Sequence, residues 1–115
     1  MPKDKILIVD DEEEFIQTLS ERMRARGLKV ETACSGKEAL EKVKSNRFDA
    51  ILLDLVMPGM DGIVTLRHLK KINPELQVIL LTGHATVKKS VSAMKSGAMD
   101  FLEKQYNLQF RVDFF

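Results

Sequence analysis

Short strand-like segments alternate with segments of helical periodicity along most of this chain. The strand-like segments are apolar runs or alternating stretches rich in β-branched residues, each bounded by polar or turn residues. They lie at residues 5–9, 28–33, 49–53, 76–82 and 99–103. Strict alternation of strands with helices predicts an α/β fold, in which a parallel sheet has helices on both faces.

The segments between these strands carry the start and stop signals of helices. Residues 12–26 place apolar side chains at helical spacing, and Gly27 follows as a stop signal. Ser35 and Glu38 fit a capping box at the start of the second helix. Residues 86–96 predict another helix that stops at Gly97.

A third helix is expected between the strands at 49–53 and 76–82. Its apolar positions are Ile63, Leu66, Leu69 and Ile72. Asn73-Pro74 ends it, because the residue before a proline avoids the helical region.

The predicted topology is a flavodoxin-like, doubly wound five-stranded parallel sheet of order 2-1-3-4-5. Right-handed crossovers leave few arrangements for five strands, and this order has its switch point between strands 1 and 3. Residues 1–104 are expected to form one domain. Residues 105–115 are expected to be an atypical C-terminal segment of that domain, as a shortened last helix or a tail.

Composition narrows the function classes. Hydrophobic residues make up 44% of the chain and charged residues 30%, which is typical of a globular domain. A net charge of +1 gives no basic field for nucleic acid. No apolar run reaches the length of a membrane span, so no membrane partner is expected. The single cysteine, Cys34, fits a reducing cytoplasm.

Three carboxylates follow the two strands that flank the predicted switch point. Asp10 and Asp11 come directly after the strand at 5–9, and Asp54 follows the strand at 49–53. Ligands in such sheets bind beyond these strand ends, so the three acids should meet in one crevice. Their mutual repulsion calls for a cation. Mg²⁺ suits the site best, because it takes one or two carboxylates together with water and phosphate oxygens.

The next two strand ends add groups that complement an acidic metal site. Thr82 places a hydroxyl at the end of the fourth strand, and Lys104 places an ammonium at the end of the fifth. A carboxylate can accept a phosphoryl group covalently, while a metal and a lysine neutralise its oxygens. The pattern therefore predicts phosphoryl chemistry at Asp54.

Four spaced motifs resemble the receiver domain of response regulators in two-component signalling. They are ILIVDDE at 6–12, LLDLVMPGMDG at 52–62, LLTGHA at 80–85 and SGAMDFLEK at 96–104. By this resemblance Asp54 is the phosphoacceptor. Asp10, Asp11 and Asp54 bind Mg²⁺, together with the backbone carbonyl of Val56.

The resemblance also assigns a switch and its modulators. Thr82 moves toward the phosphoryl group, Phe101 is the coupled aromatic residue, and Lys104 pairs with the phosphoryl oxygens. His84 lies at the rim, and the alternatives for it are solvent exposure, a partner contact or an effect on phosphoryl lifetime. Val56 is a further position that can modulate that lifetime.

The resemblance implies partners as well. A sensor histidine kinase or a phosphotransfer protein donates the phosphoryl group, and the face of the fourth and fifth strands then changes to control an output such as transcription or a relay. A homodimer through the fourth helix, fifth strand and fifth helix is a further expectation. The domain is not expected to be an enzyme, beyond assisting its own phosphorylation and dephosphorylation.

The sequence departs from the family pattern after Lys104. Gln105 stands where the family usually has proline, so a trans peptide bond is expected there. The segment 105–115 is either a short covering helix, a segment packed on another molecule, or a disordered tail. Since these departures weaken the switch, a phosphorylation-independent interaction or dimerisation module is the alternative function.

Two other functions fit the residues poorly. A magnesium phosphatase of the haloacid dehalogenase kind needs an acid two residues after its nucleophile, where this chain has Val56. A flavodoxin needs small and hydroxyl residues after its first strand, where the acids of DDEEE would repel a phosphate.

Overall fold

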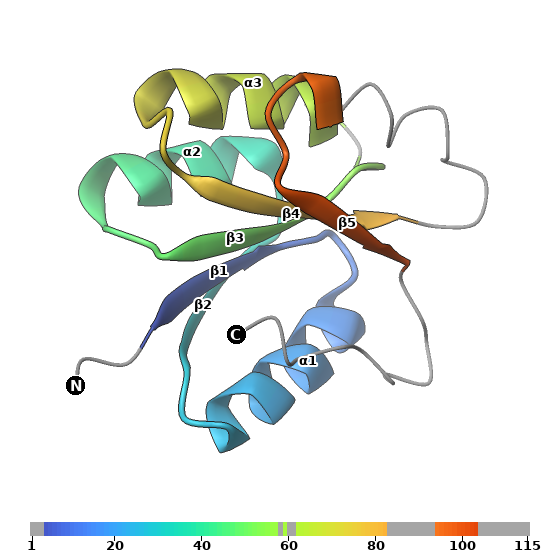
Figure 1. Cartoon of the computed structure of the whole chain (residues 1–115). Helices are drawn as coiled ribbons and strands as arrows, with labels where there is room; N and C mark the ends of the chain where they lie inside the picture. Colours follow the sequence, from blue (N-terminus) through green and yellow to red (C-terminus); the bar gives the residue numbers. More distant parts are fainter. Residues whose placement is uncertain (1–3, 58, 60–61, 83–93, 104–115) are drawn as a thin grey trace.

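The computed structural model describes residues 4–57, 59, 62–82 and 94–103 of the chain (Figure 1). For residues 82 and 100–103 it describes the backbone alone. The predicted helix at 86–96 therefore lies outside the described residues except at its end, where Met94 and Lys95 are helical and Gly97 has a φ of 106°.

Five strands and three helices are described, and they alternate up to the fourth strand. The strands are β1 (Lys5–Val9), β2 (Lys29–Ala33), β3 (Ala50–Asp54), β4 (Gln77–Thr82) and β5 (Asp100–Glu103). The helices are α1 (Glu13–Ala25), α2 (Gly36–Ser45) and α3 (Gly62–Ile72). Each predicted strand end agrees with the structure to within one residue, and the main difference is that Asp54 belongs to β3 rather than following it.

The strands pair in parallel in the order β2-β1-β3-β4-β5. The predicted α/β architecture with a parallel sheet is confirmed. β1 pairs with both β2 and β3, so the chain changes direction across the sheet after β2. Helix α1 lies on one face, and α2 and α3 lie on the other (Figure 1).

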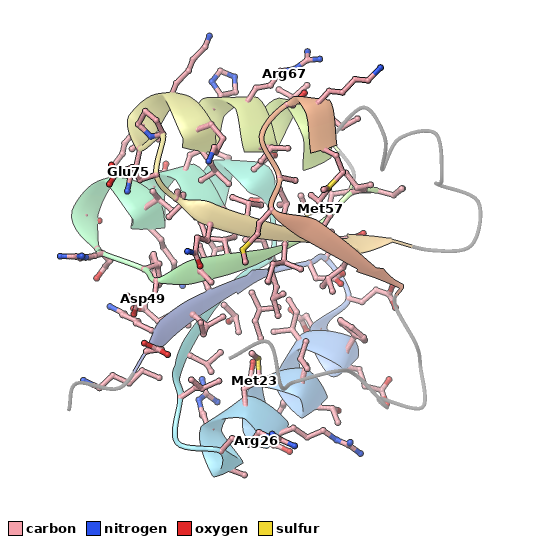
Figure 2. All side chains as sticks on the ribbon, viewed as in Figure 1. Met23, Arg26, Asp49, Met57, Arg67 and Glu75 are labelled. Atoms are coloured by element: carbon pink, nitrogen blue, oxygen red, sulfur yellow. The ribbon has the colours of Figure 1, made fainter. Side chains whose placement is uncertain are left out.

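Each face of the sheet carries its own hydrophobic core. In β1, Leu7 and Val9 join the core beneath α2 and α3, while Ile6 and Ile8 join the core with α1. Figure 2 shows both, with Met23 on the α1 side and Met57 on the opposite side. Because alternate residues of a strand point to opposite faces, a strand that is covered on both sides must be apolar throughout. This accounts for the uninterrupted apolar runs in the sequence.

The start of α2 follows the predicted cap with one change. Ser35 is the N-cap, and its hydroxyl accepts a hydrogen bond of 3.2 Å from the Glu38 backbone N–H. The Glu38 carboxylate, however, accepts from the backbone N–H of Cys34 at 3.3 Å, one residue earlier than a standard capping box requires. Glu38 therefore ties the helix to the end of β2.

We expect Ser35→Ala to lower the free energy of unfolding by about 1 kcal/mol, because the Glu38 N–H loses its acceptor. Urea denaturation measures the change. Ser45→Ala is the matched control: this hydroxyl, in the last turn of the same helix, donates to the Glu41 carbonyl and caps no free N–H. An equal loss in the two variants would contradict a capping role for Ser35.

Candidate functional site

The candidate site lies at the carboxyl ends of β1 and β3, which are neighbours in the sheet. Val9 pairs with Leu53, so the residues that follow them emerge side by side. Asp10, Asp11 and Asp54 each present a carboxylate oxygen, and these three oxygens lie within 4.8 Å of one another. The predicted convergence of the three acids is therefore present in the structure.

Asp10 is held by the backbone on both sides. Its own N–H donates to the carbonyl of Ala33 at the end of β2, at 3.1 Å, and its Oδ1 accepts from the Glu12 N–H at 3.0 Å. The side chain is completely buried. Asp11, the next residue, is exposed to solvent. The cluster thus has one acid fixed in the interior and one that faces outward.

Asp54 ends β3 and is only 6% exposed. Its Oδ1 accepts a 3.2 Å hydrogen bond from the backbone N–H of Val56, which orients the carboxylate. Beyond it, the Leu55 N–H donates to the Leu81 carbonyl at 3.1 Å, so the ladder between β3 and β4 continues past the acid. The Val56 side chain itself is 52% exposed beside the cluster.

Gly62 lets α3 begin directly against the backbone of Asp54 and Leu55. Its N–H donates to the Leu55 carbonyl at 3.0 Å. A Cβ at this position would lie 2.5 Å from the Asp54 carbonyl oxygen and 2.5 Å from the Leu55 Cα. In the sequence Gly62 appears only as the last residue of the motif LLDLVMPGMDG, and the Asp-Gly pair before an amphipathic helix was the available signal for this close packing.

Three carboxylates at this spacing repel one another unless a cation or a proton lies between them. The carboxylate oxygens at the end of β3 and in the segment between β1 and α1 suit a hard divalent cation. Helix α1 begins at Glu13, two residues after Asp11, and the N-terminus of a helix carries a partial positive charge. The donor set therefore fits a metal-assisted reaction on an anionic group.

The remaining predicted site residues are described only in part. Thr82 ends β4 one residue beyond Leu81, the partner of Asp54, so its backbone lies at the same edge of the sheet. Phe101 pairs with Leu80 through β5. The side chains of Thr82 and Phe101 lie outside the described residues, as do Lys104, His84 and the segment 105–115.

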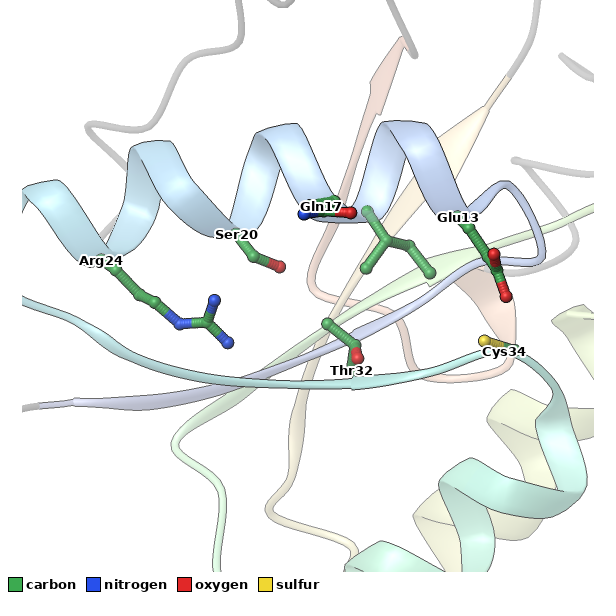
Figure 3. Close-up of a pocket in the computed structure, with 7 residues that line it drawn as sticks. Glu13, Gln17, Ser20, Arg24, Thr32 and Cys34 are labelled. Carbon is green, nitrogen blue, oxygen red and sulfur yellow. The ribbon is translucent and has the colours of Figure 1, made fainter.

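A separate groove of about 340 Å³ runs between α1 and β2 (Figure 3). It is lined by Glu13, Ile16, Gln17, Ser20, Arg24, Thr32 and Cys34. Partial burial and the nearby carboxylates of Glu38 and Glu13 raise the pKa of the Cys34 thiol, so little reactive thiolate forms at neutral pH. Cys34 is exposed, and it is not a member of the acidic cluster of Asp10, Asp11 and Asp54.

Among the residues that the structure places, none of the helices has the length and apolarity needed to cross a lipid bilayer.

We expect Gly62→Ala to destabilise the protein by about 2 kcal/mol, because the added methyl group meets backbone atoms that cannot rotate away. Thermal unfolding measures the loss. Gly59→Ala is the control, since a Cβ there meets no atom within 4 Å and costs only the strain of its φ of +79°. A smaller loss at Gly62 than at Gly59 would contradict the proposed close packing.

Comparison with known proteins places the chain among signalling proteins. Residues 6–110 match the family model of the response regulator receiver domain. It is 41% identical to the transcriptional regulatory protein ZraR of Escherichia coli over 99 residues, which are 86% of this chain and 22% of that protein. The response regulator MprA of Mycolicibacterium vanbaalenii is 35% identical over 105 residues, which are 91% of this chain and 46% of that protein.

Solved structures agree in fold. The receiver domain of NtrX from Brucella abortus superimposes with a TM-score of 0.84 at 33% identity, covering 94% of this chain and 88% of that one. A response regulator from Burkholderia pseudomallei, solved with a phosphorylated aspartic acid, a calcium ion and citrate, has a TM-score of 0.84 at 31% identity, covering 93% and 63%. The chain spans less than half the length of the two curated relatives named above. Because the family match extends over nearly the whole sequence, this chain belongs to the response regulator receiver domains of two-component systems.

Proposed function

We propose that this receiver domain accepts a phosphoryl group on Asp54 from a histidine kinase or a phosphotransfer protein. The observation that carries the proposal is the meeting of Asp10, Asp11 and Asp54, whose carboxylate oxygens lie within 4.8 Å of one another at one strand edge. Asp54 is the member whose carboxylate is fixed at the end of a central strand, by the bond from the Val56 N–H.

The proposed reaction moves one phosphoryl group between two side chains. A carboxylate oxygen of Asp54 forms the new bond to phosphorus while the bond between phosphorus and the donor's imidazole nitrogen breaks. The imidazole leaves with that electron pair and takes a proton from solvent. In-line approach needs a stationary nucleophile, and the continued ladder from Leu55 to Leu81 holds the backbone of Asp54 in place.

Mg²⁺ is the proposed cofactor, bound by Asp10, Asp11, Asp54 and the backbone carbonyl of Val56. It supplies positive charge that offsets the anionic oxygens of the group being transferred. The response regulator from Burkholderia pseudomallei was solved with a phosphorylated aspartic acid and a calcium ion, which supports a divalent cation beside a phosphorylated aspartate in a relative.

Thr82, Phe101 and Lys104 complete the proposed switch. The position of Thr82 at the end of β4, one residue beyond the partner of Asp54, supports a role for its hydroxyl next to the phosphoryl group. Lys104 follows β5 directly and would pair with the phosphoryl oxygens. Val56 and His84 would tune the lifetime of the phosphoryl group, and Phe101 would couple the change to the face of β4 and β5.

The proposed role is that of a switch acting once per phosphorylation, and not of an enzyme with a separate substrate. Its output is proposed to be transcription or a relay, supported by the name of the relative ZraR. A homodimer through the β5 side is part of the proposal, and direct binding of nucleic acid is not.

Binding of beryllofluoride, which mimics an attached phosphoryl group, tests the assignment of Asp54. We expect a bound ¹⁹F resonance with the unmodified domain in the presence of Mg²⁺, and none with Asp54→Asn, which keeps the size of the side chain and removes its charge. Asp4→Asn, at an exposed residue before β1, should bind like the unmodified domain. Equal binding by Asp54→Asn would refute the assignment, and no binding by any variant would favour a phosphorylation-independent interaction module.

Thermal unfolding with and without Mg²⁺ tests the metal site. We expect Mg²⁺ to raise the melting temperature of the unmodified domain, because a ligand of the folded state stabilises it by mass action. Asp10→Asn should lose most of this response and be about 1 kcal/mol more stable without metal, since one repelling charge is gone while the amide oxygen still accepts from Glu12. Glu14→Gln, an equal charge change at an exposed position of α1, is the control, and a full response to Mg²⁺ in Asp10→Asn would contradict the proposed metal site.

A further inference from the structure

Among the described strands, β2 stands at the end of the order and pairs only with β1, so its outer side is an edge of the described sheet. Lys29 donates its N–H to Asp4, and Ala33 receives the N–H of Asp10, so the backbone groups of these odd-numbered residues face β1. Backbone groups alternate sides along a strand, and those of Val30, Thr32 and Cys34 therefore face away from the sheet. An edge of this kind can pair with a strand from another molecule.

Three charged side chains from the two flanking helices each bind one of these outward backbone groups. Arg24 of α1 donates from Nη2 to the Val30 carbonyl at 2.9 Å, and Lys42 of α2 donates to the Thr32 carbonyl. Glu38 of α2 accepts from the Cys34 N–H at 3.3 Å. Figure 3 shows the Arg24 side chain extending from α1 toward β2 across the groove.

The three contacts have the spacing of a strand ladder. They fall on Val30 and Thr32 of β2 and on Cys34, the residue after β2, which is the two-residue repeat at which an added strand would make its own hydrogen bonds. Lys42 and Glu38 also approach each other, with 3.7 Å between charged atoms on successive turns of α2. Each contact therefore takes a donor or acceptor that a neighbouring strand would use.

We propose that Arg24, Glu38 and Lys42 close the β2 edge, and that without them this edge pairs with β2 of a second copy of the chain. The proposal is independent of phosphorylation, because none of the three residues belongs to the acidic cluster. Two identical edges related by a two-fold axis pair in antiparallel fashion, which would join the two sheets into one.

The choice of partner follows from what surrounds the edge. A second copy brings the same β2 segment, whose residues Val30 and Thr32 are β-branched and favour strand pairing. Two copies also bring Lys29 and Glu31 of both strands to the interface. In an antiparallel pair these opposite charges can face each other, with Glu31 shared between the second copy's Lys29 and Lys5 of its own chain, 2.7 Å away, which favours pairing over repulsion.

The triple variant Arg24→Met, Glu38→Met and Lys42→Met tests the proposal. Methionine keeps an unbranched apolar stem and removes every charged donor and acceptor. We expect concentration-dependent dimers in light scattering after size-exclusion chromatography. We also expect amide exchange at Val30 and Thr32 to slow about tenfold in the dimer, because an added strand protects outward N–H groups.

The matched control carries Arg26→Met, Glu41→Met and Lys44→Met. Arg26 is the C-cap of α1, and Glu41 and Lys44 lie on α2. All three are exposed, and they give the same change in charge without a side-chain hydrogen bond to β2 among the described residues. Dimers in the test variant and monomers in the control support the proposal. Monomers in both, or dimers in both, overturn it.

A second measurement tests the proposal if the triple variant folds poorly. The single variants Arg24→Met and Lys42→Met are titrated with a synthetic peptide of residues 28–34, and chemical shifts of the β2 backbone amides are followed. Saturable shifts at Val30 and Thr32 that the unmodified domain lacks support the proposal. Identical spectra of variant and unmodified domain up to the solubility limit of the peptide overturn it.

Discussion

The parallel pairing of β1 with β3 is the constraint from which the site follows. The register from Ile6 opposite Ala50 to Val9 opposite Leu53 makes the next residues of both strands emerge together. Both strands lie inside the sheet and are buried on two faces, so their ends cannot shift without disturbing two cores. Asp10 and Asp54 are thereby brought close in spite of their charge, and the stability of the cores offsets the repulsion between them.

Much of this arrangement could be predicted from the sequence. Apolar runs such as that of β1 identify strands because a doubly covered strand has no polar face, and the alternation with helices then favours a parallel sheet. Asp10, Asp11 and Asp54 could be found for the same reason, since a charged residue at the end of such a run marks the strand edge. The roles of these acids, and of Thr82 and Lys104, came from the chemistry of their positions at the strand ends and from the four motifs that resemble the receiver family.

Other features depend on contacts that no local pattern encodes. The need for glycine at position 62 arises because α3 begins against the backbone of Asp54 and Leu55, and that approach is set by the packing of a whole helix. Glu38 was expected to cap its own helix, yet it bonds to Cys34 because β2 ends within its reach. The closure of the β2 edge likewise requires Arg24 and Lys42 to converge from opposite faces of the sheet.

The backbone around Asp54 is fastened in two directions. Leu55 is bonded to Leu81 of β4 on one side and to Gly62 of α3 on the other. These two hydrogen bonds restrict the movement of the backbone that carries the Asp54 carboxylate. If the proposed phosphorylation changes the charge at that point, the rearrangement that follows would therefore fall on groups other than this doubly hydrogen-bonded backbone.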